Sequence, residues 1–223
     1  MKPSPYHGLL VVDKPGGITS RDAVDRAQRW FPRGTRLGHT GTLDPLATGV
    51  LVLGVGAATR LTEYVQRMEK VYLTTIALDR RSDTDDLDGT VEQLTFDGPP
   101  PDRAAVGRCL QTFLGEVEQV PPAFSAAKVS GRRAYALARR GEKVSLAPRR
   151  VRIYQIDLLS YEYPLLKLQV RCGKGTYIRS LARDIGQRLG RAGTVMELRR
   201  TRIGPFDEAQ ALRLEADPSA ARA

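Results

Sequence analysis

One acidic residue, Asp44, stands in a segment whose composition would hold it in place. Residues 38–50 contain three glycines, and glycine adopts backbone angles that are closed to other residues. These are Gly38, Gly41 and Gly49. Pro45 fixes its own backbone and favours an extended conformation for Asp44. A carboxylate on a stiff segment suits nucleophilic or acid–base catalysis. The alternative is that Asp44 only caps a turn, as Asp commonly does in loops.

Basic residues are concentrated in the second half of the chain. The net charge is +10, yet residues 1–120 hold 14 Lys and Arg against 16 Asp and Glu, whereas residues 121–223 hold 21 against 9. The excess is densest from Lys128 to Arg152, where Glu142 is the one acidic residue. A basic surface confined to one part of a chain is typical of nucleic-acid binding. We therefore expect an RNA or DNA partner, the alternative being a protein that is merely basic.

Composition argues against several classes of protein. The sequence contains no run of about 18 apolar residues, the length needed to span a membrane, and the first residues do not form an apolar signal segment. Cys109 and Cys172 cannot build a disulfide framework or a cysteine-rich zinc site. Residues 83–89 are acidic, but their glycine is out of register for a calcium-binding EF-hand loop. We expect a cytoplasmic protein with no membrane segment and no metal.

Strands and helices that would position Asp44 are visible as apolar patterns. Residues 8–12, 50–55, 70–78 and 166–172 predict strands, the last by strict alternation of apolar and polar residues. Helical spacing predicts four helices. The first starts at Thr19-Ser20 and stops at Pro32, the second has a face of Leu61, Tyr64, Val65 and Met68, the third starts at Asp102 and buries Cys109, and the fourth has Ile178, Leu181, Ala182 and Ile185 on one face.

Residues 38–51, GHTGTLDPLATGVL, resemble the catalytic motif of the TruB family of tRNA pseudouridine-55 synthases, and the match is nearly continuous. Further segments match that family in the same order. They are residues 13–20 (DKPxGxTS), 70–72 (KxY), 83–89 (TDTxDxxG, by resemblance), 121–128 (PPxYSAxK, with Phe124 in place of tyrosine), 175–186 (GTYIRSLxxDxG) and 198–206. Asp79 stands where the family usually has glycine. The resemblance spans about residues 8–206.

The resemblance implies a fold and a domain organisation. The fold class is α+β, with a central mixed β-sheet flanked by helices and a basic insertion, about residues 121–152, that clamps RNA. We expect one catalytic domain over residues 1–223 that acts as a monomer, with a short tail at 207–223. Many family members continue into a small RNA-binding domain of PUA type, and no such domain is expected here.

The resemblance also implies the chemistry. Asp44 would be the nucleophile, and Arg179 would keep it ionised against the desolvation of a closed pocket. Tyr72 would stack on the extruded uracil or move a proton. The reaction oxidises nothing and transfers no group to a second molecule, so we expect no cofactor. On this basis Asp44, Tyr72 and Arg179 are the predicted catalytic residues.

The implied substrate is the T-arm stem-loop of tRNA. His39 and Tyr177 would line the nucleotide pocket, and Lys14 would order the neighbouring loop. The basic insertion would contact the RNA backbone and bases. Its predicted RNA-binding residues are Lys128, Arg132, Arg133, Arg139 and Arg140. Two alternatives stay open, namely a non-catalytic RNA-binding or tRNA-folding protein on the same scaffold, and a synthase with another RNA substrate.

Overall fold

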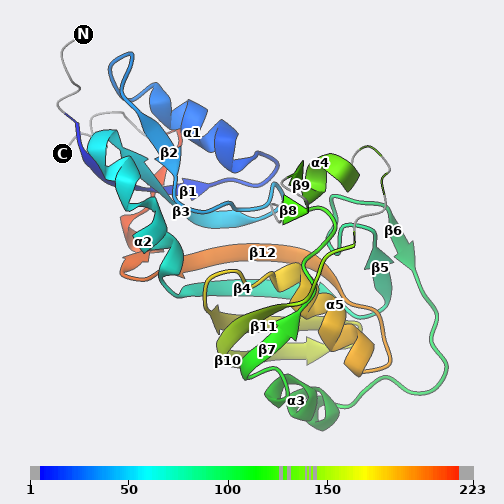
Figure 1. Cartoon of the computed structure of the whole chain (residues 1–223). Coiled ribbons are helices and arrows are strands. Elements are labelled where there is room, and N and C mark those ends of the chain that lie inside the picture. The colour runs from blue at the N-terminus through cyan, green and yellow to red at the C-terminus, as the bar shows by residue number, and fades with distance from the viewer. Residues whose placement is uncertain are drawn as a thin grey trace. The chain divides into compact units, whose positions relative to one another are not determined.

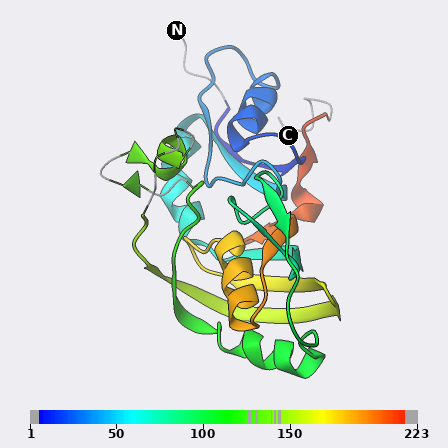
Figure 2. The same ribbon diagram turned by 90° about the vertical axis from the view of Figure 1, so that its right-hand side faces the viewer.

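The computed structural model describes residues 6–125, 128–129, 132–138, 140, 142 and 145–215. The chain forms two compact units (Figures 1 and 2). Unit 1 contains the residues up to Tyr72 together with those from Leu198 onward, and unit 2 is Leu73–Glu197. Two strands, β4 (Lys70–Ala77) and β12 (Thr194–Ile203), run from one unit into the other. The single catalytic domain expected from the sequence stays a prediction.

Unit 1 is built on a mixed sheet. β1 (Gly8–Lys14) pairs antiparallel with β3 (Thr48–Val55), which pairs in parallel with β12. In this unit the strand order is β14-β1-β3-β12-β4, and β14 (Leu212–Arg213) is parallel to β1. Two short strands complete the sheet, β2 (Leu37–His39) beside β3 and β13 (Phe206–Asp207) beside β12. The strands predicted at 8–12 and 50–55 are confirmed.

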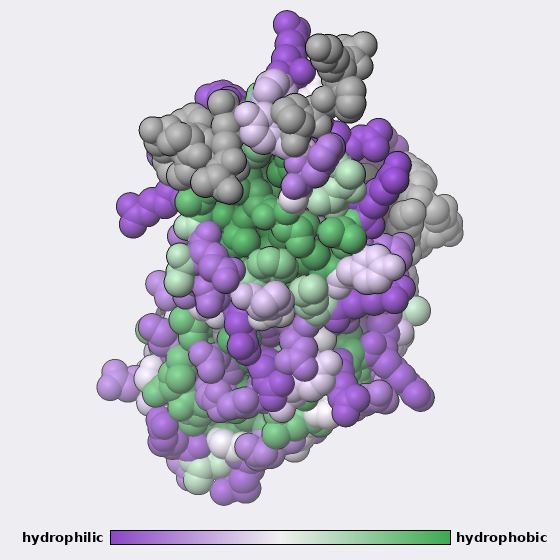
Figure 3. Space-filling view, turned by 90° about the vertical axis from the view of Figure 1, so that its left-hand side faces the viewer, coloured by the Kyte–Doolittle hydropathy of each residue, from purple (hydrophilic) through white to green (hydrophobic). Residues whose placement is uncertain are grey.

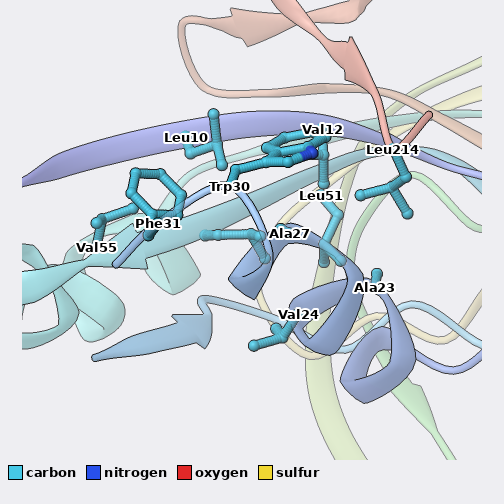
Figure 4. Close-up of a cluster of buried hydrophobic side chains, with 11 residues drawn as sticks. Leu10, Val12, Ala23, Val24, Ala27, Trp30, Phe31, Leu51, Val55 and Leu214 are labelled. Atoms are coloured by element: carbon cyan, nitrogen blue, oxygen red, sulfur yellow. The ribbon is translucent and has the colours of Figure 1, made fainter. Parts of the chain in front are cut away.

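Helix α1 (Ser20–Gln28) covers one face of this sheet. Its start is fixed by a capping box, in which the Thr19 side chain accepts from the backbone of Asp22 and the Asp22 carboxylate accepts from Thr19. The helix ends at Gln28, earlier than predicted, although Trp30 is still buried. Figure 4 shows the resulting core between α1 and the strands, with Leu214 among its members. Because both faces of β3 are covered, it reads as a continuous apolar run.

The other face of β1 and β3 carries a smaller cluster, made by Val11, Val50, Val52, Val65 and Ile203. The 3₁₀ helix η1 (Gly56–Leu61) and the short helix α2 (Thr62–Arg67) follow β3. Of the helix face predicted here, Val65 is buried, but Leu61 and Tyr64 are 43% and 66% exposed, so that part of the prediction is wrong. Figure 3 shows hydrophobic side chains gathered on the side of the molecule on which α2 lies in Figure 1.

Unit 2 continues from β4 and β12 with three further strands. Their order in this unit is β12-β4-β11-β10-β7, where β11 (Leu165–Cys172) and β7 (Gly115–Gln119) are both antiparallel to β10 (Arg149–Glu162). Helices α3 (Arg103–Gln111) and α5 (Ile178–Arg188) pack on it (Figure 2). Cys109 is buried, as predicted. Smaller elements are β5 (Arg80–Ser82), β6 (Val91–Gln93), β8 (Lys128–Val129), β9 (Arg132–Arg133) and α4 (Ala134–Ala138).

Two parts of the chain form structure that the sequence did not predict. β10 begins at Arg149, so the last residues of the expected insertion belong to the sheet of unit 2. Residues after Phe206, expected to be a short tail, form the turn η2 (Glu208–Gln210) and then β14, up to residue 215 where the description ends. Across the described residues, no helix is long and apolar enough to cross a membrane.

Candidate active site

The backbone next to Asp44 is tied to helix α1 through Ser20. The Ser20 hydroxyl donates to the carbonyl oxygen of Leu43 at 3.0 Å and accepts from the Leu43 amide at 2.8 Å. Both side chains are buried, with Ser20 2% exposed and Leu43 3% exposed. Because this reciprocal pair of hydrogen bonds is buried, water does not compete for the amide and carbonyl of Leu43. The residue that precedes Asp44 is therefore fixed, and Asp44 itself is half-buried.

The backbone after Asp44 is tied to the first strand and the turn that follows it. The Pro45 carbonyl accepts from the Gly17 amide at 2.9 Å and from the Lys14 ammonium at 3.2 Å. Lys14 also donates to the carbonyls of Pro15 and Ile18, at 2.8 Å and 2.7 Å, and its side chain is fully buried. Lys14 thus hydrogen-bonds to the backbone of the loop that carries Asp44. Direct contact of Lys14 with RNA stays a prediction.

These hydrogen bonds, rather than the glycines, hold most of the segment. Gly38 and Gly41 have ordinary backbone angles, and a Cβ atom at either position would meet open space. Gly49 differs, because its φ is +100° and a Cβ there would lie 2.3 Å from the carbonyl oxygen of Arg200. Only Gly49 therefore requires glycine. The expectation that all three glycines use special backbone angles is wrong for the first two.

The two other predicted site residues of unit 1 lie on strands. His39 ends β2 and is half-buried, and Thr40 after it is anchored by donating from its amide and its hydroxyl to the carbonyl of Val52, at 2.9 Å and 3.0 Å. Tyr72 lies on β4 and is 9% exposed. At the start of that strand, the Lys70 ammonium donates to the carbonyls of Gln66 and Met68 at 2.5 Å, which terminates α2. Their roles toward a nucleotide stay predictions.

In unit 2, Arg179 is buried and paired. It follows the first residue of α5, and its side chain is 5% exposed. Its Nη1 donates to the carbonyl of Thr84 at 2.9 Å and its Nη2 to that of Phe124 at 3.0 Å, while Nε lies 3.4 Å from Asp86 Oδ2. Burial raises the pKa of Asp86, and the hydrogen bond from Thr84 and the charge of Arg179 oppose that rise. The helix thus presents a guanidinium whose orientation is set by fixed oxygens.

The acidic turn at residues 83–89 is the partner of α5, which sequence reasoning missed. Besides Asp86 with Arg179, Asp85 binds Arg183 at 2.7 Å, and Asp85 has a positive φ of 62°. Burial raises the pKa of Asp85 and the charge of Arg183 opposes the rise. The resemblance identified this turn as a motif but not as a partner of α5. The one available signal for the pairing was that this motif contains the adjacent aspartates Asp85 and Asp86 and the motif of α5 contains two arginines.

Tyr177 precedes α5 and is positioned by Gln119. The Tyr177 amide donates to Gln119 Oε1 at 2.8 Å, and the Tyr177 carbonyl accepts from Gln119 Nε2 at 3.0 Å. Gln119 is 3% exposed, whereas the Tyr177 side chain is half-buried. Unit 2 therefore brings Tyr177 and Arg179 together at the start of one helix. Unit 1 brings Lys14 and Asp44 together, and the predicted pairing of Asp44 with Arg179 stays a prediction.

The basic insertion is described in part. β8 and β9 pair antiparallel, with Lys128 opposite Arg133, and the structure describes their backbone but not the side chains of Lys128, Arg132 and Arg133. Arg139 lies outside the described residues, and Arg140 is exposed. Within α4, Leu137 is buried and Tyr135 is 41% exposed. The basic RNA clamp therefore stays a prediction. Elsewhere in the described part of the chain, no group of three or more His, Cys, Asp or Glu residues could hold a metal ion.

Two family profiles match the chain, and together they cover most of it. Residues 29–178 match "TruB family pseudouridylate synthase (N terminal domain)", and residues 179–216 match "tRNA pseudouridylate synthase B C-terminal domain". A relative from Leifsonia xyli subsp. xyli, called tRNA pseudouridine synthase B, is 48% identical over 96% of this chain and 73% of its own length. One of the same name from Syntrophotalea carbinolica is 43% identical over 94% of this chain and 68% of its own length.

Solved structures show the same fold. A chain of "Crystal Structure of a Cbf5-Nop10-Gar1 Complex" is 29% identical with a TM-score of 0.72, and the match covers 95% of this chain and 54% of that one. A chain of "Structure of H/ACA RNP bound to a substrate RNA containing 2'-deoxyuridine" is 26% identical with a TM-score of 0.69, over 95% and 52% of the two chains. The chain thus spans about half the length of these solved proteins. The predicted mixed sheet with flanking helices is confirmed.

Proposed function

We propose, on the premise that this chain belongs to the TruB family of pseudouridylate synthases, that Asp44 is the carboxylate that attacks the target uridine. The chain is an isomerase of the tRNA pseudouridine(55) synthase type, by its similarity to relatives called tRNA pseudouridine synthase B. One observation supports the role of Asp44 most directly. The carbonyl of Leu43, just before Asp44, accepts from the buried Ser20 hydroxyl, and the carbonyl of Pro45, just after it, accepts from the buried Lys14 ammonium. A nucleophile needs this kind of fixed backbone.

The proposed reaction changes the bond between base and sugar. The bond from C1′ of ribose to N1 of uracil breaks, the base turns, and a new bond joins C1′ to C5. N1 gains a proton and C5 loses one, so the isomerisation consumes no oxidant or co-substrate. Asp44 forms a transient covalent bond, either to C1′ or to the uracil ring, and is regenerated when the product forms. This use of one carboxylate is consistent with our expectation of no cofactor.

The proposed substrate is uridine 55 in the T-arm of tRNA. A base in a folded loop must leave its stack before it can react, which costs a few kcal/mol. Tyr72 and Tyr177 would contact the extruded base, and His39 would occupy the space beside it. The exposed Tyr135 and Arg140 of the basic insertion would contact the RNA around the target. Contacts of this kind with aromatic rings and guanidinium groups are common in loop recognition.

Arg179 is proposed as the cationic partner of the Asp44 carboxylate. Its guanidinium is oriented by carbonyl oxygens of Thr84 and Phe124, and its Nε lies 3.4 Å from Asp86 Oδ2, so its orientation is fixed from three sides. A monomeric state and a cytoplasmic location are further proposals, which follow from the family and from the composition of the chain. Sedimentation of the purified protein, alone and with tRNA, would test the monomer.

The decisive experiment is release of tritium from tRNA that carries 5-tritiated uridine. Formation of the new bond at C5 must expel that hydrogen, so the signal reports the isomerisation itself. We expect release from one T-loop uridine by the wild type, no release by Asp44→Asn, and unchanged tRNA binding by that variant. Asp25→Asn, which changes an exposed residue of α1, is the matched control and should retain the wild-type rate.

Two results would contradict the proposal in different ways. Tritium release by Asp44→Asn at the wild-type rate would show that another group is the nucleophile. Tight binding of tRNA by the wild type with no release at any uridine would favour the alternative, a non-catalytic RNA-folding protein. Release from an RNA other than tRNA would leave the chemistry intact and change the substrate.

A further inference from the structure

Arg200 is a buried guanidinium beneath the segment that carries Asp44. It lies on β12 and is 2% exposed. Its Nε donates to the carbonyl of Val50 at 2.8 Å, and its Nη1 donates to the carbonyl of Thr42 at 3.4 Å. Its Nη2 is buried and has no hydrogen-bond partner among the described residues. Within the same residues, no carboxylate forms an ion pair with Arg200.

The neighbouring arginine shows how differently the two are used. Arg199 is about one-third exposed, and its guanidinium binds Asp13 at 3.0 Å and also Glu208. Successive side chains of a strand point to opposite faces, so Arg199 and Arg200 leave β12 on opposite sides. Two carboxylates neutralise Arg199, whereas Arg200 is buried with backbone carbonyls as its partners.

A buried charge of this kind is costly. Removing an ion from water carries a penalty of several kcal/mol, and a well-packed apolar side chain of similar size is often neutral or stabilising in its place. Two carbonyl hydrogen bonds, one of them long, and a buried N–H group without a partner compensate poorly for that penalty. Packing alone therefore gives a weak reason for an arginine here.

The position of Arg200 suggests the stronger reason. Thr42, whose carbonyl it contacts, is two residues before Asp44, and Lys14 contacts the carbonyl of Pro45, one residue after it. Arg200 also pairs with Gly49 at the end of the same segment, where any Cβ would strike its carbonyl oxygen. Two buried cations, Arg200 and Lys14, thus hydrogen-bond to the backbone on either side of Asp44.

We propose that Arg200 is a positioning residue for Asp44. Through the carbonyls of Thr42 and Val50, its guanidinium fixes the backbone of the segment that carries the Asp44 carboxylate. This inference rests on the proposed role of Asp44 and extends it to a residue that lies in a different motif, 156 residues further along the chain. Arg200 does not touch the substrate. The long Thr42 contact is the one that would shorten as the complex forms.

Three variants separate charge, shape and position. Arg200→Met removes the charge and keeps an unbranched apolar side chain, whereas Arg200→Lys keeps the charge and loses the planar fork. Arg202→Met is the matched control, because it removes one positive charge from an exposed position on the same strand. For each variant, kcat and KM are measured by tritium release, and the melting temperature by circular dichroism.

We expect kcat to fall about 100-fold in Arg200→Met, the scale of a misplaced reacting group, with KM changed by less than about threefold. Arg200→Lys should recover at least about tenfold of that loss, because charge is restored. Arg202→Met should keep the wild-type kcat. A folded Arg200→Met with wild-type kcat would overturn the inference. So would equal kcat for the Met and Lys variants, which would show a steric role only.

Failure of the inference is distinguishable from failure of the proposed function. If the wild type releases no tritium, the proposed function fails before any Arg200 variant is compared. If the wild type is active and Asp44→Asn is not, the role of Asp44 stands, and the Arg200 variants alone decide the inference. Should Arg200→Met fail to fold, kcat of Arg200→Lys is compared with that of the wild type. Lys keeps the charge but loses the planar fork, so a lower kcat supports the positioning role. A wild-type kcat in Arg200→Lys would overturn it.

Discussion

Arg179 and Asp86 form a buried ion pair in unit 2, with Nε 3.4 Å from Oδ2 and both side chains at most 5% exposed. The pair is not isolated, because the Thr84 hydroxyl donates to Asp86 at 2.5 Å while the Thr84 carbonyl accepts from Arg179. One threonine therefore contacts both charges. The helix that carries Arg179 is oriented by a turn about 93 residues earlier in the chain.

Removal of the carboxylate should be costly to both stability and activity. In Asp86→Asn the buried guanidinium of Arg179 loses its counter-charge, and breaking a buried pair in this way typically costs about 3–5 kcal/mol. We expect the free energy of unfolding in urea to fall by that order, and kcat to fall because Arg179 is no longer held. Asp97→Asn, at an exposed position, should leave both unchanged. A stable Asp86→Asn with full activity would contradict the prediction.

Lys14 should be needed for the loop rather than for its charge alone. In Lys14→Met the carbonyls of Pro15, Ile18 and Pro45 lose a buried donor; Pro45 keeps the Gly17 amide, and each carbonyl left unsatisfied costs about 1–3 kcal/mol. We expect a lower melting temperature and a lower kcat in the tritium assay. Lys167→Met removes the same charge from an exposed position of β11 and serves as the control. Equal losses in the two variants would point to net charge instead.

The glycines of the Asp44 segment should differ sharply in their tolerance. Gly49→Ala forces an L-residue to φ +100° and drives its Cβ into the Arg200 carbonyl, so it should cost more than the roughly 1–2 kcal/mol of the backbone strain alone. Gly41→Ala meets open space at ordinary angles and should be neutral. Urea unfolding of the two variants gives the comparison. Similar stability would show that the segment moves freely at residue 49.

The cap of helix α1 should make a stability contribution that depends on pH. Hydrogen bonds from Thr19 lower the pKa of Asp22 below its ordinary value of 3.8. Because the folded state favours the ionised carboxylate, this stabilisation is present above pH 3.8 and is lost as the pH falls through the lower, folded value. The stability difference between wild type and Asp22→Asn should therefore be constant at neutral pH and shrink in stronger acid. A difference that does not vary with pH would contradict this.

Local patterns in the sequence predicted the parts of the fold that local physics decides. The apolar run of β3 and the capping residues of α1 are readable because burial on both faces and a helix start leave short signals. β10 was missed because its buried Val151 and Ile153 alternate with Arg150 and Arg152, which looked like part of an RNA clamp. Charge on the exposed face of a strand hides the period.

The contacts that hold the candidate site residues in place could not be predicted from the sequence. Asp44 and Arg179 were identified by resemblance, whereas the partners that fix them were not. Neither the helix start nor the motif that contains Ser20 indicates that its hydroxyl will bind Leu43, and nothing local in residues 83–89 indicates that Asp86 will meet a helix 93 residues later. Pairings over such distances depend on tertiary packing, which one sequence does not display.

The position of β14 has a consequence for how the protein is made. Unit 1 needs β1 from the start of the chain, but β14 and the part of β12 that belongs to unit 1 are synthesised only after all of unit 2. Until then, β1 lacks β14 and the start of β3 lacks β12, and such open edges invite pairing with other chains. Unit 2, whose residues are contiguous, can begin to fold on the ribosome first. We therefore expect chaperone dependence during translation to be greatest in the interval between release of residue 72 and release of residue 213.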